Sequence, residues 1–264
     1  CRKSKRLMSF YSPLLNALNK SVRVSGKKII RDFGEIEKLQ SSVKETTKFV
    51  SIVKSNLNKD ITEILKKLRP DLTVESKNVD IKDCWILKIL DSTTNFSRGI
   101  DNFFISVSLK ENGNINISAL YNPIKDENLC FQSGSGGYKN DYRIRVSETK
   151  KLNNSISSFF GTKTKTDGNI ILGEIRQIMK KNNIETRESG SIMHEISLIA
   201  CGKTDCLFFT ELDKDISNQI SLILSETGGI FDQFELRKKK IYIASNKYIG
   251  KIIKEMIENK YEDQ

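Results

Sequence analysis

Histidine is nearly absent from this chain, because His194 is the only one among its 264 residues. A zinc site, a Ser-His-Asp triad or a Cys-His pair would therefore depend on that single side chain. His194 lies in the middle of an apolar helical pattern, so we expect it to be structural. The scarcity of histidine argues against zinc chemistry and against a histidine-activated nucleophile.

Cysteine is also sparse, and its distribution argues against a disulfide framework. The five cysteines are Cys1, Cys84, Cys130, Cys201 and Cys206. They are dispersed, odd in number and never spaced as CxxC, which is typical of buried, reduced thiols in a cytosolic protein. We therefore expect a cytoplasmic location.

Long apolar runs are missing as well. Lys, Asn or Ser interrupts every hydrophobic stretch before it reaches the ~20 residues that a membrane-spanning helix needs, so we expect no membrane insertion. Residues 1–7 are basic, but no apolar signal-peptide segment follows them. We interpret them as an N-terminal extension before Met8, and a lipidated Cys1 is the alternative.

Positive charge is in excess, because 44 Lys and Arg against 33 Asp and Glu give a net charge of +11. The hydrophobic share of 38% and the charged share of 29% are ordinary for a globular protein. The excess suits RNA or another anionic partner. Since lysine occurs along the whole chain beside much Asn, Ile and Ser, an AT-biased genome is the alternative explanation.

The first part of the chain has the apolar spacing of helices. Residues 12–33 begin with a Ser-Pro helix start and continue at helical spacing, and Gly34 is expected to end or interrupt that helix. A second apolar stripe covers residues 53–68 and is closed by Pro70. Two helices are therefore predicted before any strand.

Strand patterns follow at residues 85–87, 103–109 and 115–121, with a strong hairpin turn at 111–114 between the last two. The second half of the chain alternates helical and strand patterns up to a terminal helix. No repeat, low-complexity tract or obvious linker interrupts them. These patterns predict a layered α/β architecture.

Four short motifs occur in the order of one known family. They are LDSTTNF at residues 90–96, SGSGGYKN at 133–140, RESGS at 187–191 and ETGG at 226–229. Together they resemble the inositol monophosphatase family, whose signature reads DGTTNF. Residues 31–71 are similar to the first helices of bacterial SuhB proteins, and the resemblance covers nearly all of residues 8–260.

The resemblance implies a fold and an activity. The fold is α/β, the five-layered αβαβα sandwich of the inositol monophosphatase and sugar phosphatase type, as one domain over residues 8–260 with closely packed halves near 8–147 and 148–260. The activity is Mg²⁺-dependent hydrolysis of inositol monophosphate, commonly by a homodimer. The SuhB resemblance further implies a role with the transcription antitermination machinery or RNA, which need not require phosphatase activity.

The same resemblance implies the residues of the site. Magnesium takes oxygen ligands, which correspond here to Glu75, Asp91 and the backbone carbonyl of Leu90. Thr93 is implied to orient the attacking water. The implied phosphate-binding residues are Ser92, Thr93, Thr94, Gly190 and Ser191, the last two at a helix start whose dipole favours anions.

The sequence departs from the family pattern where acids are expected. Lys88 stands in place of an aspartate just before the signature, and counting back along the preceding helix places the early acidic residue on Lys54. Counting from both sides places the late metal-binding aspartate on Ile216, although a slip of one residue would supply Asp215. The family's inositol-contacting glutamate falls on Phe209.

These departures decide which function we expect. An ammonium ~4 Å from a divalent ion costs several kcal/mol even at an effective dielectric near 20. Lys54 and Lys88 should therefore prevent ordinary magnesium binding and pair with Asp91 and Glu75 instead. We expect a family member with impaired catalysis that acts by binding. The alternative is an active inositol-1-monophosphatase whose ligands are rearranged around Asp215.

Overall fold

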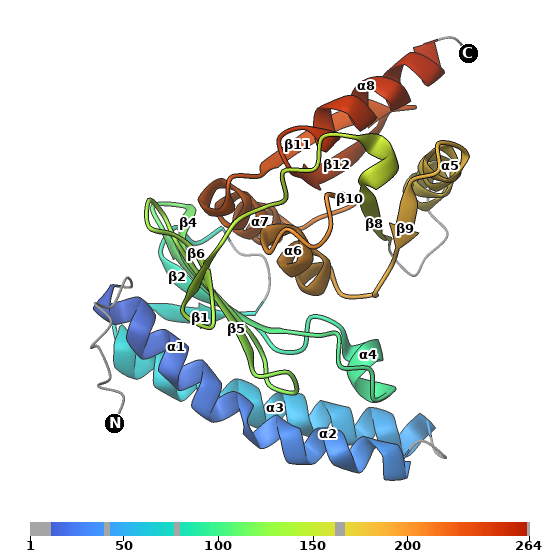
Figure 1. Cartoon of the computed structure of the whole chain (residues 1–264). Helices are drawn as coiled ribbons and strands as arrows, with labels where there is room; N and C mark the ends of the chain where they lie inside the picture. The colour runs from blue at the N-terminus through green and yellow to red at the C-terminus, as the bar shows by residue number, and fades with distance from the viewer. Residues whose placement is uncertain (1–11, 40–42, 77–79, 162–166, 263–264) are drawn as a thin grey trace, which may run out of the picture.

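The structure is a computed structural model, and it describes residues 12–39, 43–76, 80–161 and 167–262. Layers of helices and sheets alternate in it (Figure 1), and they make the αβαβα sandwich that the sequence predicts. Among the described residues, no helix is both long and apolar enough to cross a membrane.

Helices form three of the layers. The first outer layer contains α1 (Pro13–Gly26), α2 (Lys28–Leu39) and α3 (Val43–Leu68), the central layer α6 (Ile192–Ala200) and α7 (Lys214–Thr227), and the second outer layer α5 (Asp167–Lys181) and α8 (Ile249–Glu262). The short α4 (Thr93–Ser97) and a 3-10 turn (Leu152–Asn154) lie in connections. The central helices therefore contact both sheets.

The first sheet is a meander whose seven strands lie in sequence order. The strands are β1 (Thr73–Glu75), β2 (Cys84–Lys88), β3 (Ile105–Glu111), β4 (Asn114–Asn122), β5 (Glu127–Gln132), β6 (Gly136–Lys139) and β7 (Tyr142–Ile144). Only β1 and β2 are parallel within this sheet. Asn112 and Gly113 join β3 to β4 with φ of 52° and 81°, the left-handed pair that a two-residue hairpin turn requires.

The second sheet has the strand order β11-β12-β10-β8-β9. Its strands are β8 (Ile156–Phe160), β9 (Glu185–Arg187), β10 (Cys206–Phe209), β11 (Ile230–Leu236) and β12 (Lys239–Ser245). Strand β8 is parallel to β9 and β10, whereas β10 and β12 are antiparallel. The carboxyl ends of β8 and β10 therefore lie at the same edge, next to the site described below.

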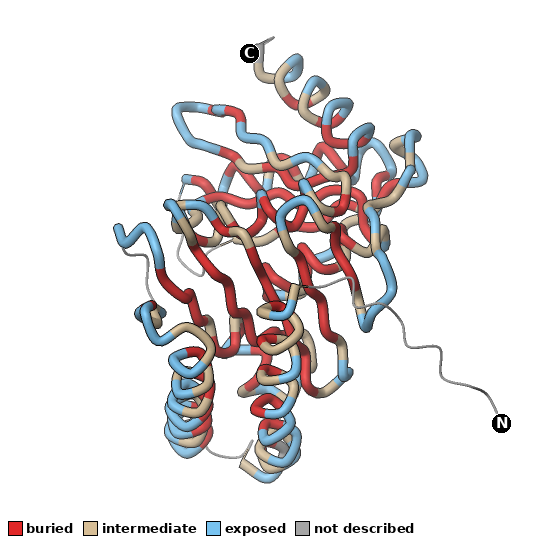
Figure 2. Tube along the Cα trace, turned by 90° about the vertical axis from the view of Figure 1, so that its left-hand side faces the viewer, coloured by how far each residue is buried: buried red, intermediate tan, exposed pale blue. Residues whose placement is uncertain are grey.

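Three apolar cores separate the layers. One lies between the α1–α3 layer and the first sheet, one between the two sheets around α6 and α7, and one between the second sheet and α5 and α8. Figure 2 shows the buried residues concentrated along the strands and on the inner sides of the helices. The apolar stripe of α3 contributes Val53, Leu57, Ile61 and Leu65 to the first core.

The first predicted helix is interrupted earlier than expected. Helix α1 ends at Gly26, and α2 continues through Gly34, so the expectation that Gly34 ends the helix is wrong. A Cβ on Gly26 would lie 2.7 Å from the ring of Tyr121, so the close approach of the helix to β4 requires glycine there. No atom lies within 4 Å of a Cβ placed on Gly34. The tertiary contact, rather than local propensity, sets this boundary.

Candidate functional site

A pocket of about 880 Å³ lies where α3, the end of β2, and the N-terminal ends of α6 and α7 meet. It contains the beginning of the LDSTTNF motif and both lysines that replace expected acids. The pocket is built by segments that are distant in sequence. Its side chains therefore come together through the packing of α3, the two sheets and the central helices on one another.

Asp91 anchors the floor of the pocket. Its Oδ1 accepts a hydrogen bond from the Phe104 N–H at 2.7 Å, and its Oδ2 accepts from the Ser191 hydroxyl at 2.5 Å and the Met193 N–H at 3.0 Å. Burial raises the pKa of the Asp91 carboxyl, and these hydrogen bonds act in the opposite direction. Asp91 thus joins the end of β2 to the start of α6, and both its oxygens already have donors.

The backbone turns sharply beside Asp91. Leu90 has a φ of 56°, in the left-handed region that is uncommon for a residue with a branched side chain. Both Leu90 and Thr93 line the pocket, but Ser92 and Thr94 do not. Ser92 instead caps α4, accepting a hydrogen bond from the Asn95 N–H at 3.4 Å.

Gly190 and Ser191 stand at the start of α6, close to the LDSTTNF motif. The Asn95 amide donates to the Ser189 carbonyl at 2.8 Å, and Gly190 has a φ of 77°. The buried Ser191 hydroxyl donates to Asp91 and accepts from the His194 N–H at 3.0 Å, which makes Ser191 the N-cap of α6. These two residues support the pocket from behind, and Ile192 and Met193 line it.

Lys54 and Lys88 both line the pocket, at the positions that sequence counting assigned to lost acids. The Lys54 Nζ lies 3.4 Å from the Thr93 Oγ1, and the Lys88 Nζ lies 3.4 Å from the Asp213 Oδ2. The predicted pairing of these lysines with Asp91 and Glu75 is therefore wrong. The oxygens of Asp91 instead accept from Phe104, just before β3, and from Ser191 and Met193 at the start of α6.

Asp213 is a site residue that sequence reasoning missed. Its Oδ1 accepts from the Ile216 N–H at 2.8 Å and so caps α7, while its Oδ2 faces Lys88. The signal was present, because an aspartate just before an apolar helical pattern is a common N-cap. Glu211, which also lines the pocket, is exposed and has a φ of 51°.

Asp215 does not reach the pocket, so the slip of one residue that would make it a metal ligand is not found. Its carboxylate is buried and lies 3.0 Å from the Lys110 Nζ, on the side of α7 that faces the first sheet. Ile216 lines the pocket instead. The side chains of neighbouring helical residues point about 100° apart around the helix axis, so Asp215 points away from the pocket when Ile216 lines it.

Glu75 and Phe209 also lie outside the pocket. Glu75 pairs with Ile86 at the end of β1, and its neighbour Ser76 is the residue that lines the pocket. Phe209 is fully buried, and its ring stacks on Tyr242 at 5.6 Å and on Phe231 at 6.0 Å. The position that the resemblance assigned to an inositol-contacting acid therefore belongs to an aromatic core.

The pocket residues do not fit a magnesium ion. Asp91, Glu211 and Asp213 line it, but in the part of the chain that the structure describes no three His, Cys, Asp or Glu side chains lie close enough to hold a metal. The Asp91 oxygens accept from N–H and O–H groups, and Asp213 faces an ammonium. Magnesium needs clustered, free oxygen ligands, and this arrangement does not supply them.

Comparison with known proteins agrees with the motifs. The model of the inositol monophosphatase family matches residues 11–260. An inositol-1-monophosphatase of Rhizobium meliloti (strain 1021) is 32% identical over 259 residues, which cover 94% of this chain and 97% of that protein. The Nus factor SuhB of Pasteurella multocida (strain Pm70) is 27% identical over 237 residues, which cover 84% and 86% of the two chains.

Solved structures show the same fold. The SuhB protein of Bartonella henselae superposes with a TM-score of 0.75 at 28% sequence identity. The match covers 92% of this chain and 98% of that one.

Proposed function

Because the chain belongs to the inositol monophosphatase family, we propose that it is a member that has lost magnesium-dependent hydrolysis and acts as a binding or regulatory protein. One observation carries this proposal: Lys54, Lys88 and Ile216 line the pocket at the positions where the family resemblance implies carboxylates. The chain would then be a pseudoenzyme that keeps the family's fold.

Electrostatics supports the loss of the metal. Two unit charges ~4 Å apart interact by about 4 kcal/mol at an effective dielectric of 20, and a divalent ion doubles the repulsion. Two lysines would oppose the ion, whereas the family's carboxylates would attract it. Hydrolysis of an anionic phosphomonoester relies on the cation to neutralise charge and to activate water, so the same substitutions remove both contributions.

Calorimetry with magnesium and a phosphate-release assay with inositol 1-phosphate test the proposal directly. We expect no magnesium-binding isotherm and no turnover above that of Thr93→Val, which removes the implied water-orienting hydroxyl. Asp91→Asn is a poorer control, because it would also disturb three hydrogen bonds of the fold. Clear magnesium-dependent turnover by the wild-type protein would establish the alternative, an active inositol-1-monophosphatase.

A restoration experiment tests the cause. The triple variant Lys54→Asp, Lys88→Asp and Ile216→Asp should gain affinity for magnesium, because it removes two ammoniums and adds three carboxylates beside Asp91. Each single restoration should do little, since groups that act as a unit lose function together. If the triple variant binds no more magnesium than the wild type does, these positions are not what excludes the metal.

The distribution of charge supports a polyanionic partner. Residues 1–68 hold sixteen Lys and Arg but only six Asp and Glu, so they carry +10 of the net +11. Residues 69–264 are almost neutral, with 28 basic and 27 acidic residues. A genomic bias would spread the excess over the whole chain, whereas the excess here is concentrated in the N-terminal quarter, whose described residues form the outer α1–α3 layer.

The α3 helix presents much of this charge. Lys44, Lys48, Lys59 and Lys66 are exposed and separated by 4, 11 and 7 residues, so they form one stripe along the helix. None of them forms an ion pair with another described residue. We name these four residues the α3 lysine stripe. A linear row of unpaired lysines suits the phosphates of RNA, which is the kind of partner that the name Nus factor of the SuhB relatives suggests.

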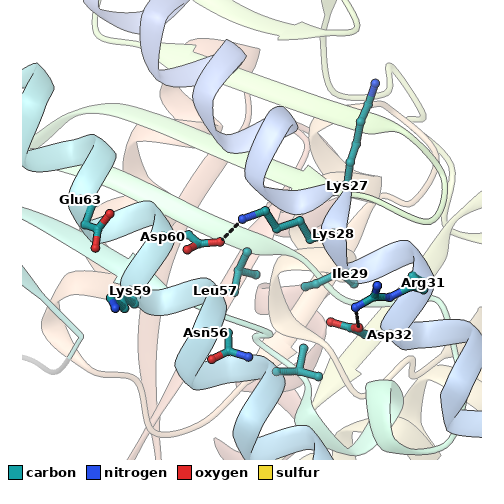
Figure 3. Close-up of a pocket in the computed structure, with 11 residues that line it drawn as sticks. Lys27, Lys28, Ile29, Arg31, Asp32, Asn56, Leu57, Lys59, Asp60 and Glu63 are labelled. Carbon is teal, nitrogen blue, oxygen red and sulfur yellow. Dashed lines mark hydrogen bonds and ion pairs between the residues drawn. The ribbon is translucent and has the colours of Figure 1, made fainter.

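A groove between α2 and α3 adjoins the stripe (Figure 3). It has a volume of about 770 Å³, and Lys27, Lys28, Arg31 and Lys59 contribute to its walls. Lys28 is paired with Asp60 at 2.5 Å and Arg31 with Asp32 at 3.8 Å, so only part of this charge is available to a partner. We therefore assign the main contribution to the α3 lysine stripe rather than to the groove.

A further inference from the structure

Two ammonium groups in the pocket have weak partners within the protein. Among the described residues, the Lys54 Nζ contacts a neutral hydroxyl, that of Thr93, at 3.4 Å. Lys88 faces Asp213 at 3.4 Å, which is longer than the 2.7–2.9 Å of a strong charge-assisted hydrogen bond. The Lys88 side chain is 24% exposed, so its charge is only partly solvated. Both ammonium groups can therefore donate hydrogen bonds to a bound anion.

The acids of the pocket do not neutralise these lysines well. Asp91 already accepts from the start of α6 and from Phe104 just before β3, and Asp213 uses one of its two oxygens to cap α7. Glu211 is exposed to solvent, where its charge is screened. Within the described part of the chain, no carboxylate is therefore bonded to the Lys54 ammonium.

Apolar side chains also line the pocket. They include Phe160 at the end of β8, Leu212 in the connection before α7 and Ile216 on α7, together with Ile192 and Met193 at the start of α6. No acid comes from position 209, because Phe209 is buried in its aromatic stack. The apolar side chains of the pocket offer dispersion contacts to an apolar or aromatic group.

From this arrangement we propose that the pocket is a metal-independent binding site for a phosphomonoester whose alcohol part is apolar or aromatic. The Lys54 and Lys88 ammoniums together supply the two positive charges that a divalent ion would otherwise bring to the phosphate. The apolar side chains of the pocket hold the organic part of the ligand. The inference rests on the proposed loss of magnesium binding, and it names the ligand class of the same pocket.

The physical reason for a monoester is its charge. A phosphomonoester carries close to two negative charges at neutral pH, which match two ammonium donors. Lysine binds phosphate as a compact point charge with three rotatable donors, so it needs no fixed planar geometry. A phosphodiester has one negative charge and two organic arms, and it would leave one ammonium unmatched.

Calorimetry with three probes in EDTA tests the site. Phenyl phosphate supplies both features of the proposed ligand, inorganic phosphate supplies only the anion, and inositol 1-phosphate supplies the anion with a polar body. We expect phenyl phosphate to bind most tightly, at least about tenfold more tightly than inositol 1-phosphate, because a buried ring gains apolar contacts that a polyol loses. Adding magnesium should leave each affinity unchanged within about twofold.

Four variants locate the site. Lys54→Met and Lys88→Met should each weaken the binding of phenyl phosphate about tenfold or more, because each removes a hydrogen bond to the charged phosphate. Lys66→Met removes the same charge from the exposed side of α3, outside the pocket, and should have an effect below twofold. Asp213→Asn keeps an N-cap acceptor but removes the charge that competes for Lys88, so it should strengthen binding.

The outcomes separate this inference from the proposed function. Binding that requires magnesium overturns the metal-independent site, and magnesium-dependent turnover overturns the proposed function as well. No binding of any probe overturns the inference while leaving the loss of hydrolysis intact. Equal losses in Lys66→Met and Lys54→Met would overturn it too, because the effect would then come from net charge rather than from the pocket.

Discussion

Lys110 on β3 and Asp215 on α7 form an ion pair in the interior of the protein, with 3.0 Å between Nζ and Oδ1. Their side chains are 4% and 1% exposed. The pair joins the first sheet to the central helix layer and lies on the side of α7 that faces β3. Ile216, the next residue along α7, lines the pocket, so the Asp215 carboxylate serves a structural contact and not the pocket.

Breaking this pair should destabilise the protein strongly. Asp215→Asn or Lys110→Met removes one charge of this buried ion pair, and each should lower the free energy of unfolding by about 3–5 kcal/mol. The double variant Lys110→Met and Asp215→Leu should lose less than the sum of the two, because it removes both buried charges together. Urea unfolding measures all three. Lys38→Met, which breaks the exposed pair with Glu35, is the control and should change stability by less than about 1 kcal/mol.

His194 should make stability depend on pH in a predictable direction. Burial lowers the pKa of its imidazole below the ordinary 6.5, and the nearby positive charge of Lys125 adds to this. Its Nδ1 has no hydrogen-bond partner among the described residues, and its ring stacks on Phe104 at 6.3 Å. Since the folded pKa is lower than the unfolded one, protonation favours the unfolded chain, and stability is lost as the pH falls below about 6.5.

The measurement is urea unfolding between about pH 5 and 8, for the wild type and for His194→Gln. As the pH decreases, the free energy of unfolding of the wild type should fall more than that of the variant, because the variant has no histidine to protonate. Because His194 is the only histidine, its pKa in the folded protein can also be measured from the single set of imidazole resonances in an NMR titration. A folded pKa at or above 6.5 would contradict the prediction.

Glu226 should stabilise the glycine-rich turn between β5 and β6. Its two carboxylate oxygens accept from the N–H groups of Gly134 at 2.8 Å and Gly136 at 2.7 Å. Glu226→Ala removes both charge-assisted bonds and should lower the free energy of unfolding by about 1–3 kcal/mol. Thermal unfolding checks this against Glu63→Ala, an exposed glutamate on α3, which should have little effect.

RNA binding, if it uses the α3 lysine stripe, should be sensitive to salt and to those four lysines. Changing all four to Gln should weaken the binding of a mixed-sequence RNA and reduce the slope of log K against log salt by about 2–3, since each phosphate contact contributes ~0.7 for a single strand. Fluorescence anisotropy at several salt concentrations measures this.

The matched control removes four exposed lysines from the second half of the chain. Lys180, Lys181, Lys203 and Lys247 are replaced by Gln, which lowers the net charge by the same amount. We expect this variant to keep most of the affinity. If both quadruple variants lose affinity equally, net charge and not the stripe governs binding. If the wild type binds no RNA even at low salt, genomic bias is the better explanation of the lysine excess.

Much of the fold was predictable because its signals are local. The LDSTTNF motif, the Asn112-Gly113 turn and the apolar stripe of α3 each depend on neighbouring residues, and together with the family resemblance they indicated the layered fold. Counting along a helix assigned Lys54 to the site, and Lys54 lines the pocket, since a regular helix has a fixed rise and direction per residue.

The sequence by itself therefore determined the family, the order of the layers and the arrival of Lys54 and Lys88 at the pocket. Tertiary structure alone decided which carboxylate Lys88 contacts, because Asp213 is 125 residues away in the sequence. It also decided that Asp215 pairs with Lys110, that Phe209 joins an aromatic core, and that the first helix is interrupted at Gly26. These outcomes depend on packing between distant segments, which no local pattern encodes.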